Sequence, residues 1–387
     1  MSIKLKVTFT IIISLVIGGL AIIYLLDKSY KDNINLVAEE SIRAAKETFN
    51  SLERDDTKML SSTLEALLIN EEIKKIFLKK DREKLFEYAT PLFKNLKERY
   101  GITHWYFINP EPDQTIFLRM HKSTHSDQWG DVVKRATYLK SVETKGFGTG
   151  KELGKTAFAL RVVHPYYDNN KLIGYLELGQ EIDHFFEIMK KQTGNDFGLL
   201  IDKKYLDEKA WAGVRAGKGL KNNWADMHDV VLIDKTTKDE HIIDFKGDLE
   251  EVVPPAGKVL EEFKKNGSVF VRGVFPVYDA KNTMVGGVFV IKDITSIYNS
   301  MKATQTKAVI FLVVLMSAIS IIMLLMLNNL IFVRLNSMIN TATRVVGGDY
   351  QTKIIPSADD EVGKFESLFE QFRTVFVNIL NELEKKK

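Results

Sequence analysis

The sequence predicts an α+β membrane protein, in which two transmembrane helices flank a large domain built from antiparallel sheets. Three observations predict this class: two long uncharged apolar stretches, an internal repeat of a strand–turn–strand unit, and an apolar heptad pattern near the C-terminus. The average composition, with 27% charged and 45% hydrophobic residues, is that of an ordinary folded protein. A net charge of +3 is too balanced for a nucleic-acid binder, so we expect no nucleic-acid partner.

The two apolar stretches, residues 7–26 and 308–333, carry no charged side chain over 20 and 26 positions. About 20 apolar residues suffice to cross the hydrocarbon of a bilayer. The first stretch exceeds the roughly 7 to 15 residues of a secretory signal core and lacks a small-residue cleavage site, so it predicts an uncleaved anchor. Lysines flank both sides of the spans and leave the orientation open. The spans divide the chain into a short tail (1–6), a long segment (27–307) and a terminal segment (334–387).

The long segment contains an internal repeat. Residues 158–183 and 270–294 share an Arg four positions before a Pro, a Tyr-Asp pair at the strand end, a polar turn, a Gly and a second apolar strand. The two prolines, Pro165 and Pro276, lie 111 residues apart, which indicates two modules of about 110 residues. Polar turns between strands rich in Val, Phe and Tyr predict β-hairpins, and hence antiparallel sheets.

A long helix is expected before the first sheet, because apolar residues recur at three-to-four spacing from Leu36 to Leu52. A helix emerging from the first span, two mixed modules and a strand running into the second span form an order that resembles the double Cache sensor domain of bacterial transmembrane receptors. The resemblance is carried by residues 117–122 (FLRMHK), 150–168 (GKELGKTAFALRVVHPYYD) and 172–183 (LIGYLELGQEID).

This resemblance implies two PAS-like antiparallel sheets on a long helix, with the sensor domain outside the cytoplasm. The membrane-distal module would span about 75–195 and the membrane-proximal module 196–296. In such domains a small ligand sits on one side of the distal sheet.

Alternation along the strands separates an apolar face of the distal sheet from a polar one. On 114–121 we place Ile116, Leu118 and Met120 on the apolar face, and Phe117 with two polar residues on the other. In the strand 172–179, Leu172 is placed on the apolar face. The polar face collects six candidate site residues: Tyr106, Arg119, His121, Arg161, Tyr175 and Glu177.

Two interpretations of this polar face remain open. Arg161 and Glu177 could form a structural ion pair across neighbouring strands. Alternatively, the face floors a pocket capped by a long loop, 122–157, in which guanidinium, imidazole and phenol groups bind a small polar or anionic ligand. The equivalent strands of the proximal module are apolar on both faces except for Arg272 and Lys292, so we expect a mechanical role there.

No cofactor or metal is predicted. The chain has no cysteine, and the histidines His121 and His125 follow a strand without a supporting carboxylate.

The terminal segment predicts two helices joined by an extended connector. Seven apolar residues of the second helix step alternately by three and four, which is typical of a helix that must pair: Val362, Phe365, Phe369, Phe372, Phe376, Ile379 and Leu383. Together with Gly348-Asp349 and with Asp360, Glu361 and Gly363, this arrangement is similar to a HAMP linker, although Leu335 stands where a proline is common. The likeness implies a parallel four-helix bundle in a homodimer and a cytoplasmic C-terminus.

The two resemblances together imply a transmembrane signal-transducing receptor of the bacterial inner membrane, with its sensor domain periplasmic or extracellular. No enzymatic activity is expected of this chain. It would be either the sensor part of a histidine kinase, diguanylate cyclase or chemoreceptor, or a short receptor that signals to a separate cytoplasmic partner. The alternative is a non-signalling, membrane-anchored solute-binding or adhesive module, which would not need a heptad pattern beyond the membrane.

Overall fold

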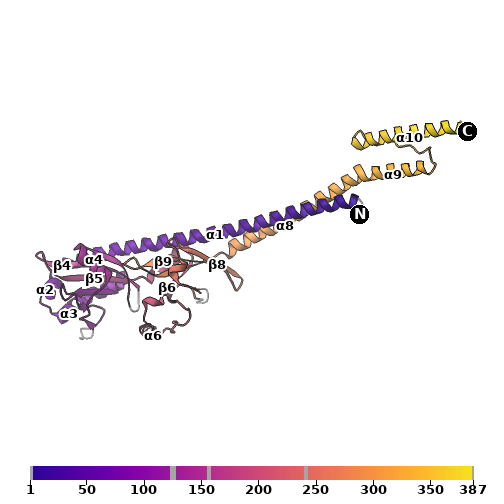
Figure 1. Cartoon of the computed structure of the whole chain (residues 1–387). Coiled ribbons are helices and arrows are strands. Elements are labelled where there is room, and N and C mark those ends of the chain that lie inside the picture. The colour runs from indigo at the N-terminus through magenta and orange to yellow at the C-terminus, as the bar shows by residue number, and fades with distance from the viewer. Residues whose placement is uncertain (1–2, 123–127, 155–157, 239–242, 386–387) are drawn as a thin grey trace. The chain divides into compact units, whose positions relative to one another are not determined.

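A computed structural model gives the structure of the protein and describes residues 3–122, 128–154, 158–238 and 243–385. His125 lies outside these residues. The chain divides into two compact units, one formed by Asp32–Tyr298 and the other by Met1–Lys31 together with Asn299–Lys387. Figure 1 shows the elements of both units in chain order.

The chain begins with the 66-residue helix α1 (Ile3–Leu68). Its part within the larger unit buries apolar residues at helical spacing, among them Ile42, Phe49, Leu60 and Leu64. Two further helices follow, α2 (Glu71–Leu78) and α3 (Arg82–Tyr100). Each begins at a side-chain cap, because the carboxamide of Asn70 and the carboxylate of Asp81 accept hydrogen bonds from backbone N–H groups three residues further on.

The distal sheet has five antiparallel strands in the order β2-β1-β5-β4-β3. They are β1 (His104–Ile108), β2 (Ile116–Arg119), β3 (Gly148–Leu153), β4 (Phe158–Asp168) and β5 (Lys171–Glu181). Helix α4 (Ala136–Thr144) packs along β3 and β4. The segment 122–157, expected as one long loop, therefore contains a helix and an edge strand. That expectation was wrong because α4 has only nine residues, too few to show a clear apolar period.

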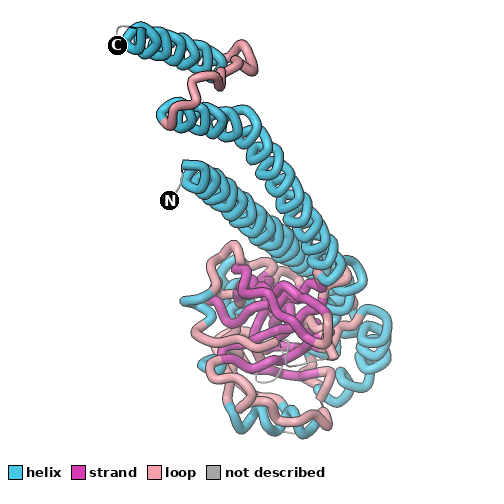
Figure 2. Tube along the Cα trace, turned by 90° about the vertical axis from the view of Figure 1, so that its right-hand side faces the viewer, coloured by secondary structure: helices cyan, strands magenta, loops and turns pink. Residues whose placement is uncertain are grey.

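The proximal sheet repeats this topology, with the order β7-β6-β10-β9-β8. Its strands are β6 (Asp196–Asp202), β7 (Val230–Lys235), β8 (Lys258–Lys265), β9 (Ser268–Tyr278) and β10 (Met284–Asp293). Helix α5 (His184–Thr193) links the two sheets, and η2 (Lys203–Tyr205), α6 (Glu208–Gly217) and α7 (Leu249–Val252) complete the module. The predicted hairpins and the two antiparallel sheets are confirmed. Figure 2 shows the strands in magenta.

One hydrophobic core joins α1 to both sheets. It contains Phe49 of α1, Phe107 and Leu178 of the distal sheet, and Phe275 of the proximal sheet. The ring centroid of Phe49 lies 5.7 Å from that of Phe275 and 5.4 Å from that of Phe185 in α5. The long helix is thus the shared support of the two modules.

Two β-bulges change the predicted strand faces. Along the β1–β2 pair, Phe107 is opposite Leu118 but Ile108 is opposite Ile116, so Phe117 is the extra residue. Ile116 therefore lies with the polar face, while Phe117 joins the apolar core. A bulge in a strand reverses the face of every residue on one side of it.

A similar irregularity between β4 and β5 affects a second position. Tyr166 is opposite Gly174, whereas Tyr167 is opposite Leu172. Leu172 consequently packs against the cluster on the polar face and Ile173 is in the apolar core, contrary to the predicted assignment of Leu172.

Helix α8 (Thr295–Leu327) begins in the larger unit and continues into the smaller one, which also contains η4 (Asn328–Phe332, a π-helical turn), α9 (Val333–Val346) and α10 (Glu361–Lys385). The first part of α1 and the continuous α8–α9 segment are long and apolar enough to cross a membrane. In α9, Arg334 forms ion pairs with Asp360 and Glu366 at 2.8 and 2.9 Å. These bonds fix the beginning of α10 against α9.

Candidate functional site

The six predicted residues lie on or next to one face of the distal sheet. In the strand register Tyr106 of β1 is opposite both Arg119 of β2 and Glu177 of β5. Arg161 of β4 and Tyr175 of β5 share this face, and His121 follows the end of β2.

The carboxylate of Glu177 organises the centre of the face. Its two oxygens accept hydrogen bonds from Arg161 Nη1 and Arg135 Nη2, and the side chain is fully buried. Burial opposes the ionisation of Glu177, but the charges and hydrogen bonds of the two arginines outweigh burial and lower its pKa. Burial likewise opposes the charge of Arg161, and the charge of Glu177 reverses that effect and raises the pKa of Arg161. The ion pair proposed from the sequence is therefore present, with a second arginine added to it.

Three guanidinium groups surround the ring of Tyr106. The central guanidinium carbons of Arg119, Arg135 and Arg161 lie 5.6, 5.2 and 5.5 Å from the ring centroid. A phenol face attracts cations at this range, so the tyrosine holds positive groups that would otherwise repel one another.

Two histidines border the same ring. The ring centroid of His121 lies 5.4 Å from that of Tyr106 and 4.9 Å from that of His104. Burial, and then the neighbouring cations, lower the pKa of His121 to about 4. The same two causes, with Arg161 as the leading cation, lower the pKa of His104 to about 2. Both imidazoles are therefore neutral near pH 7, because burial and the neighbouring positive charges both disfavour the protonated form.

Helix α4 covers this face of the sheet. The buried ring of Tyr138 meets that of Tyr175 edge to face, with centroids 4.9 Å apart. Five buried polar atoms at this cover have no hydrogen-bond partner among the described residues: His121 Nδ1, Arg135 Nε, Thr137 Oγ1, Tyr138 Oη and Arg161 Nε. Buried polar groups are nearly always paired, so this region has unused hydrogen-bonding capacity for a polar molecule.

A cleft of about 430 Å³ lies beside the covered face. Arg119 and Arg135 line it, and Arg119 is held by the carboxylate of Asp131 and by the backbone oxygen of Gln128. These two arginines belong both to the wall of the cleft and to the ring of cations around Tyr106. The other five predicted residues do not line this cleft.

Sequence reasoning missed three residues that contribute to this face. His104 could have been found, because strand alternation places it on the side of Tyr106. Arg135 and Tyr138 could not, since both fall in the segment predicted as a loop. The proximal counterpart of Arg161 is Arg272, which forms an ion pair with the exposed Glu261 of the edge strand β8.

Residues 39–230 match a family model described as the double sensory domain of two-component sensor kinase. Among curated proteins, none matches the chain. Solved structures similar to the chain include the ligand-binding domain of the Campylobacter jejuni chemoreceptor Tlp3 in complex with 4-methylisoleucine. It is 15% identical, with a TM-score of 0.36, and the match covers 70% of this chain and 92% of that one.

A second similar structure is the sensor domain of the V. cholerae histidine kinase DctB, 10% identical, with a TM-score of 0.40, covering 67% of this chain and 98% of that one. A third is a domain of a putative sensory box/GGDEF family protein from Vibrio parahaemolyticus. It is 12% identical, with a TM-score of 0.35, and the match covers 68% of this chain and 96% of that one. The family model agrees with the repeated five-stranded topology and the long N-terminal helix. Over residues 39–230, the chain thus matches the double Cache family of sensor domains.

Proposed function

We propose that the protein is a transmembrane signal-transducing receptor of the bacterial inner membrane. Its distal module binds a small polar or anionic ligand, and binding shifts the helices that cross the membrane. The proposed ligand-binding residues are Tyr106, Arg119, His121, Arg161, Tyr175 and Glu177, joined by Arg135.

The observation that carries this proposal is the cluster of guanidinium groups around Tyr106. Three arginines face two carboxylates there, Glu177 and Asp131, and two of the arginines keep an unpartnered buried Nε among the described residues. Guanidinium groups bind carboxylates and other oxyanions in two-pronged geometry, so a small anion is the ligand class that this cluster favours.

The proximal sheet supplies a direct connection to the second apolar helix. Strand β10 ends at Asp293 and α8 begins at Thr295. The backbone N–H of Val269 donates to the hydroxyl of Thr295 at 2.9 Å, which ties this junction to β9. A shift of the sheet would therefore be passed to α8. Displacements of about 1 to 2 Å are typical of such helix shifts, and coupling of about 1 to 3 kcal/mol changes an output roughly 5- to 150-fold.

The terminal helices are proposed to be a HAMP linker that pairs in a homodimer. Support comes from the ion pairs of Arg334 and from the apolar seam of α10, in which Phe372 is 68% exposed in the single chain. A seam of exposed phenylalanines is unfavourable in water and requires a partner helix. The bundle would act on a cytoplasmic signalling partner or on an output domain.

A thermal-shift screen of the full chain in detergent tests the ligand-binding proposal. Small carboxylates, phosphates and amino acids are screened with the wild type, with Arg161→Ala, and with Arg272→Ala as the matched control in the proximal repeat. We expect at least one compound to stabilise the wild type and Arg272→Ala but not Arg161→Ala. Stabilisation that survives Arg161→Ala, or that both variants lose, would contradict the assignment of the site. Pairing of two copies through the apolar seam of α10 would separate signalling from a non-signalling, solute-binding or adhesive module, which does not need such a seam.

A further inference from the structure

The two modules touch at the hairpin between β9 and β10. The backbone N–H of Ala280, in the hairpin turn, donates to the carbonyl of Lys151 on distal strand β3 at 2.7 Å. The neighbouring Gly150 has a φ of +152°, and a Cβ on it would lie 2.7 Å from the Cβ of Ala280. The ammonium group of Lys151 also bonds to Glu53 of α1 at 2.5 Å. The hairpin therefore contacts β3, the same strand whose Lys151 bonds to α1.

The cleft of about 430 Å³ lies beside this contact and takes its walls from both modules. The distal wall comes from β2, the segment 131–135 and β3, and the proximal wall comes from η2, the hairpin turn and β10. The titratable groups that line it are Arg119, Asp131, Lys134, Arg135, Glu152, Tyr205, Asp279 and Lys281.

Each carboxylate in the cleft already has partners. Asp131 pairs with Arg119. Glu152 accepts the backbone N–H of Thr137 at 2.8 Å. Asp279 accepts the backbone N–H groups of Lys281 and Thr283, both at 2.9 Å.

The two lysines of the cleft differ from these carboxylates. Among the residues that the structure describes, neither the ammonium group of Lys134 nor that of Lys281 makes an ion pair or a side-chain hydrogen bond. Lys134 belongs to the distal wall and Lys281 to the proximal hairpin turn. A pair of ammonium groups contributed by two modules to one cleft is suited to an anion that contacts both.

We propose that this cleft is a second ligand site, which binds a small oxyanion, a phosphate or a carboxylate, between Lys134 and Lys281. The site shares Arg119 and Arg135 with the face around Tyr106 but differs from it, because it also uses the proximal module and its ligand would contact the hairpin. A bound oxyanion holds the turn at Ala280 against β3 and so braces the contact between the modules. The shared wall residues Arg119 and Arg135 make this second site a means of adjusting the first.

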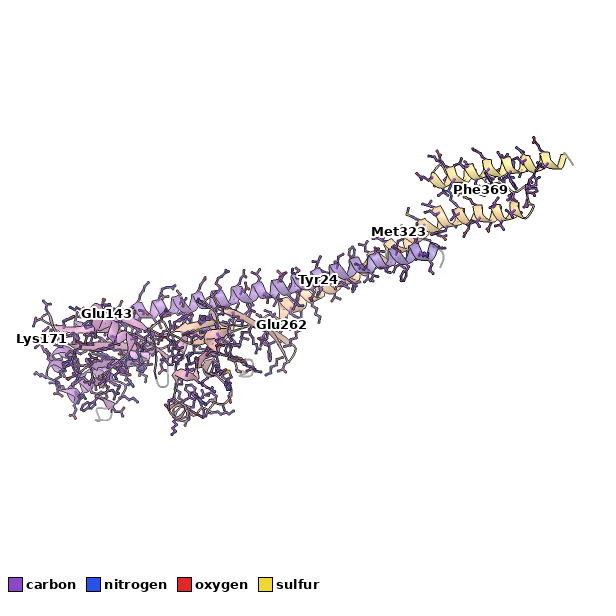
Figure 3. The ribbon with its side chains drawn as sticks, in the orientation of Figure 1. Tyr24, Glu143, Lys171, Glu262, Met323 and Phe369 are labelled. Atoms are coloured by element: carbon purple, nitrogen blue, oxygen red, sulfur yellow. The ribbon has the colours of Figure 1, made fainter. Side chains whose placement is uncertain are left out.

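The test is a calorimetric titration of the full chain in nanodiscs with inorganic phosphate and, separately, with malonate, at constant ionic strength. We expect saturable binding that Lys134→Gln and Lys281→Gln each weaken about fivefold, as one partly exposed charge contact would. Lys171→Gln, an exposed lysine on the outer hairpin of the distal module labelled in Figure 3, is the matched control and should leave the affinity unchanged. Hydrogen exchange of the turn 279–283 should slow when the anion binds.

Three results would overturn the proposal. The first is that neither anion binds. The second is that Lys171→Gln weakens binding as much as the cleft variants do, which would show a general charge effect. The third is binding that Arg161→Ala abolishes and Lys281→Gln leaves intact, which would place the anion at the polar face alone. Circular dichroism of each variant confirms that the substitution leaves the fold in place.

Discussion

At the residue scale, the polar face depends on one carboxylate shared by two arginines. Glu177 is fully buried and bonds to both Arg161 and Arg135. A buried charge is stable only where opposite charges and hydrogen bonds replace its lost hydration. The three side chains therefore stabilise the sheet and its cover as a unit, and any ligand that competes for Arg135 acts on that unit.

Replacing Glu177 should expose this dependence. Glu177→Gln leaves two guanidinium groups facing each other without their counter-charge, and we expect a loss of about 3 kcal/mol in the free energy of unfolding, seen as a lower melting temperature. Glu143→Gln is the matched control, an exposed glutamate on α4 labelled in Figure 3, and should change stability by less than about 0.5 kcal/mol. A Glu177→Gln variant as stable as the control would show that the ion pairs of Glu177 with Arg161 and Arg135 do not stabilise the fold.

The buried histidines predict acid sensitivity. The pKa of His121 is lowered to about 4 in the folded protein, below the ordinary value of 6.5 that it regains on unfolding. Between these values the unfolded state binds more protons, so stability is complete above pH 6.5 and is lost as the pH falls toward 4. His104, whose pKa is also lowered, adds to this loss of stability at low pH. His184 opposes it, because its bonds to Asp56 outweigh burial and raise its pKa.

Melting temperatures of the wild type and of His121→Gln, measured from pH 7.5 to pH 4.5, check this prediction. The melting temperature of the wild type should fall further than that of His121→Gln over this pH range. In a domain of this size, each kcal/mol of lost stability lowers the melting temperature by about 2 to 4 °C. Parallel curves would mean that His121 does not resist protonation in the fold.

Much of this face could be predicted at the residue scale, since alternation alone places Tyr106, Arg161 and Glu177 together. The alternation rule gave the wrong face for Ile116 and Leu172, because a β-bulge adds a residue that the sequence pattern does not reveal. It also missed Arg135, which reaches Glu177 from a different segment of the chain. Side-chain pairing between distant segments depends on tertiary packing, which a strand pattern does not contain.

At the element scale, β3 links the polar face to the rest of the sensor domain. In the sheet register Gly150 of β3 is opposite Arg161 of β4, and it also contacts Ala280 of the proximal hairpin. Strand β3 is thus adjacent to Arg161, a partner of Glu177, on one side and to the proximal module on the other.

Gly150→Ala should destabilise the domain by about 1 to 3 kcal/mol, because the new methyl group meets Ala280 and the φ of +152° disfavours a side chain. The double variant Gly150→Ala with Ala280→Gly removes the steric part and should recover some of the loss. Chemical denaturation of the three proteins measures this. Equal losses in the single and the double variant would show that the close approach is not the cause.

The seam of α10 tests the proposed bundle. Phe372 is 68% exposed in the single chain, so Phe372→Asp should leave an isolated chain intact. If the seam pairs two copies, the aspartates would face each other in an apolar interface and chemical crosslinking of the α10 helices should fall at least about tenfold. Asn378→Asp, an exposed position on the same helix outside the seam, is the control. Crosslinking that Phe372→Asp leaves unchanged would contradict the homodimer.

The strands of both sheets were predictable as elements because their apolar runs are bounded by polar turns. Helix α4 was not, since a helix of nine residues with Thr, Ser and Lys on it carries too little periodicity. The edge strand β3 contains two glycines and two charged residues and lacks a strand pattern of its own. Both elements form because they pack on β4, which is a tertiary cause.

At the scale of the whole molecule, the two modules share a topology and differ in chemistry. Both have the same five-stranded order, but Glu177 is a buried acid at the centre of the distal sheet, whereas Arg272 of the proximal sheet pairs with the exposed Glu261 of an edge strand. The repeat could be found in the sequence because its Arg-to-Pro spacing is kept in both copies. The polar residues on the distal strands are the reason why we propose the site in that copy.

A crystal structure of the sensor with the strongest stabilising compound from the thermal-shift screen would locate the ligand. We expect the compound to lie between the distal sheet and α4, in contact with Arg161 or Arg135 and with Tyr106. A compound bound in the proximal module, or one that contacts neither arginine, would contradict it.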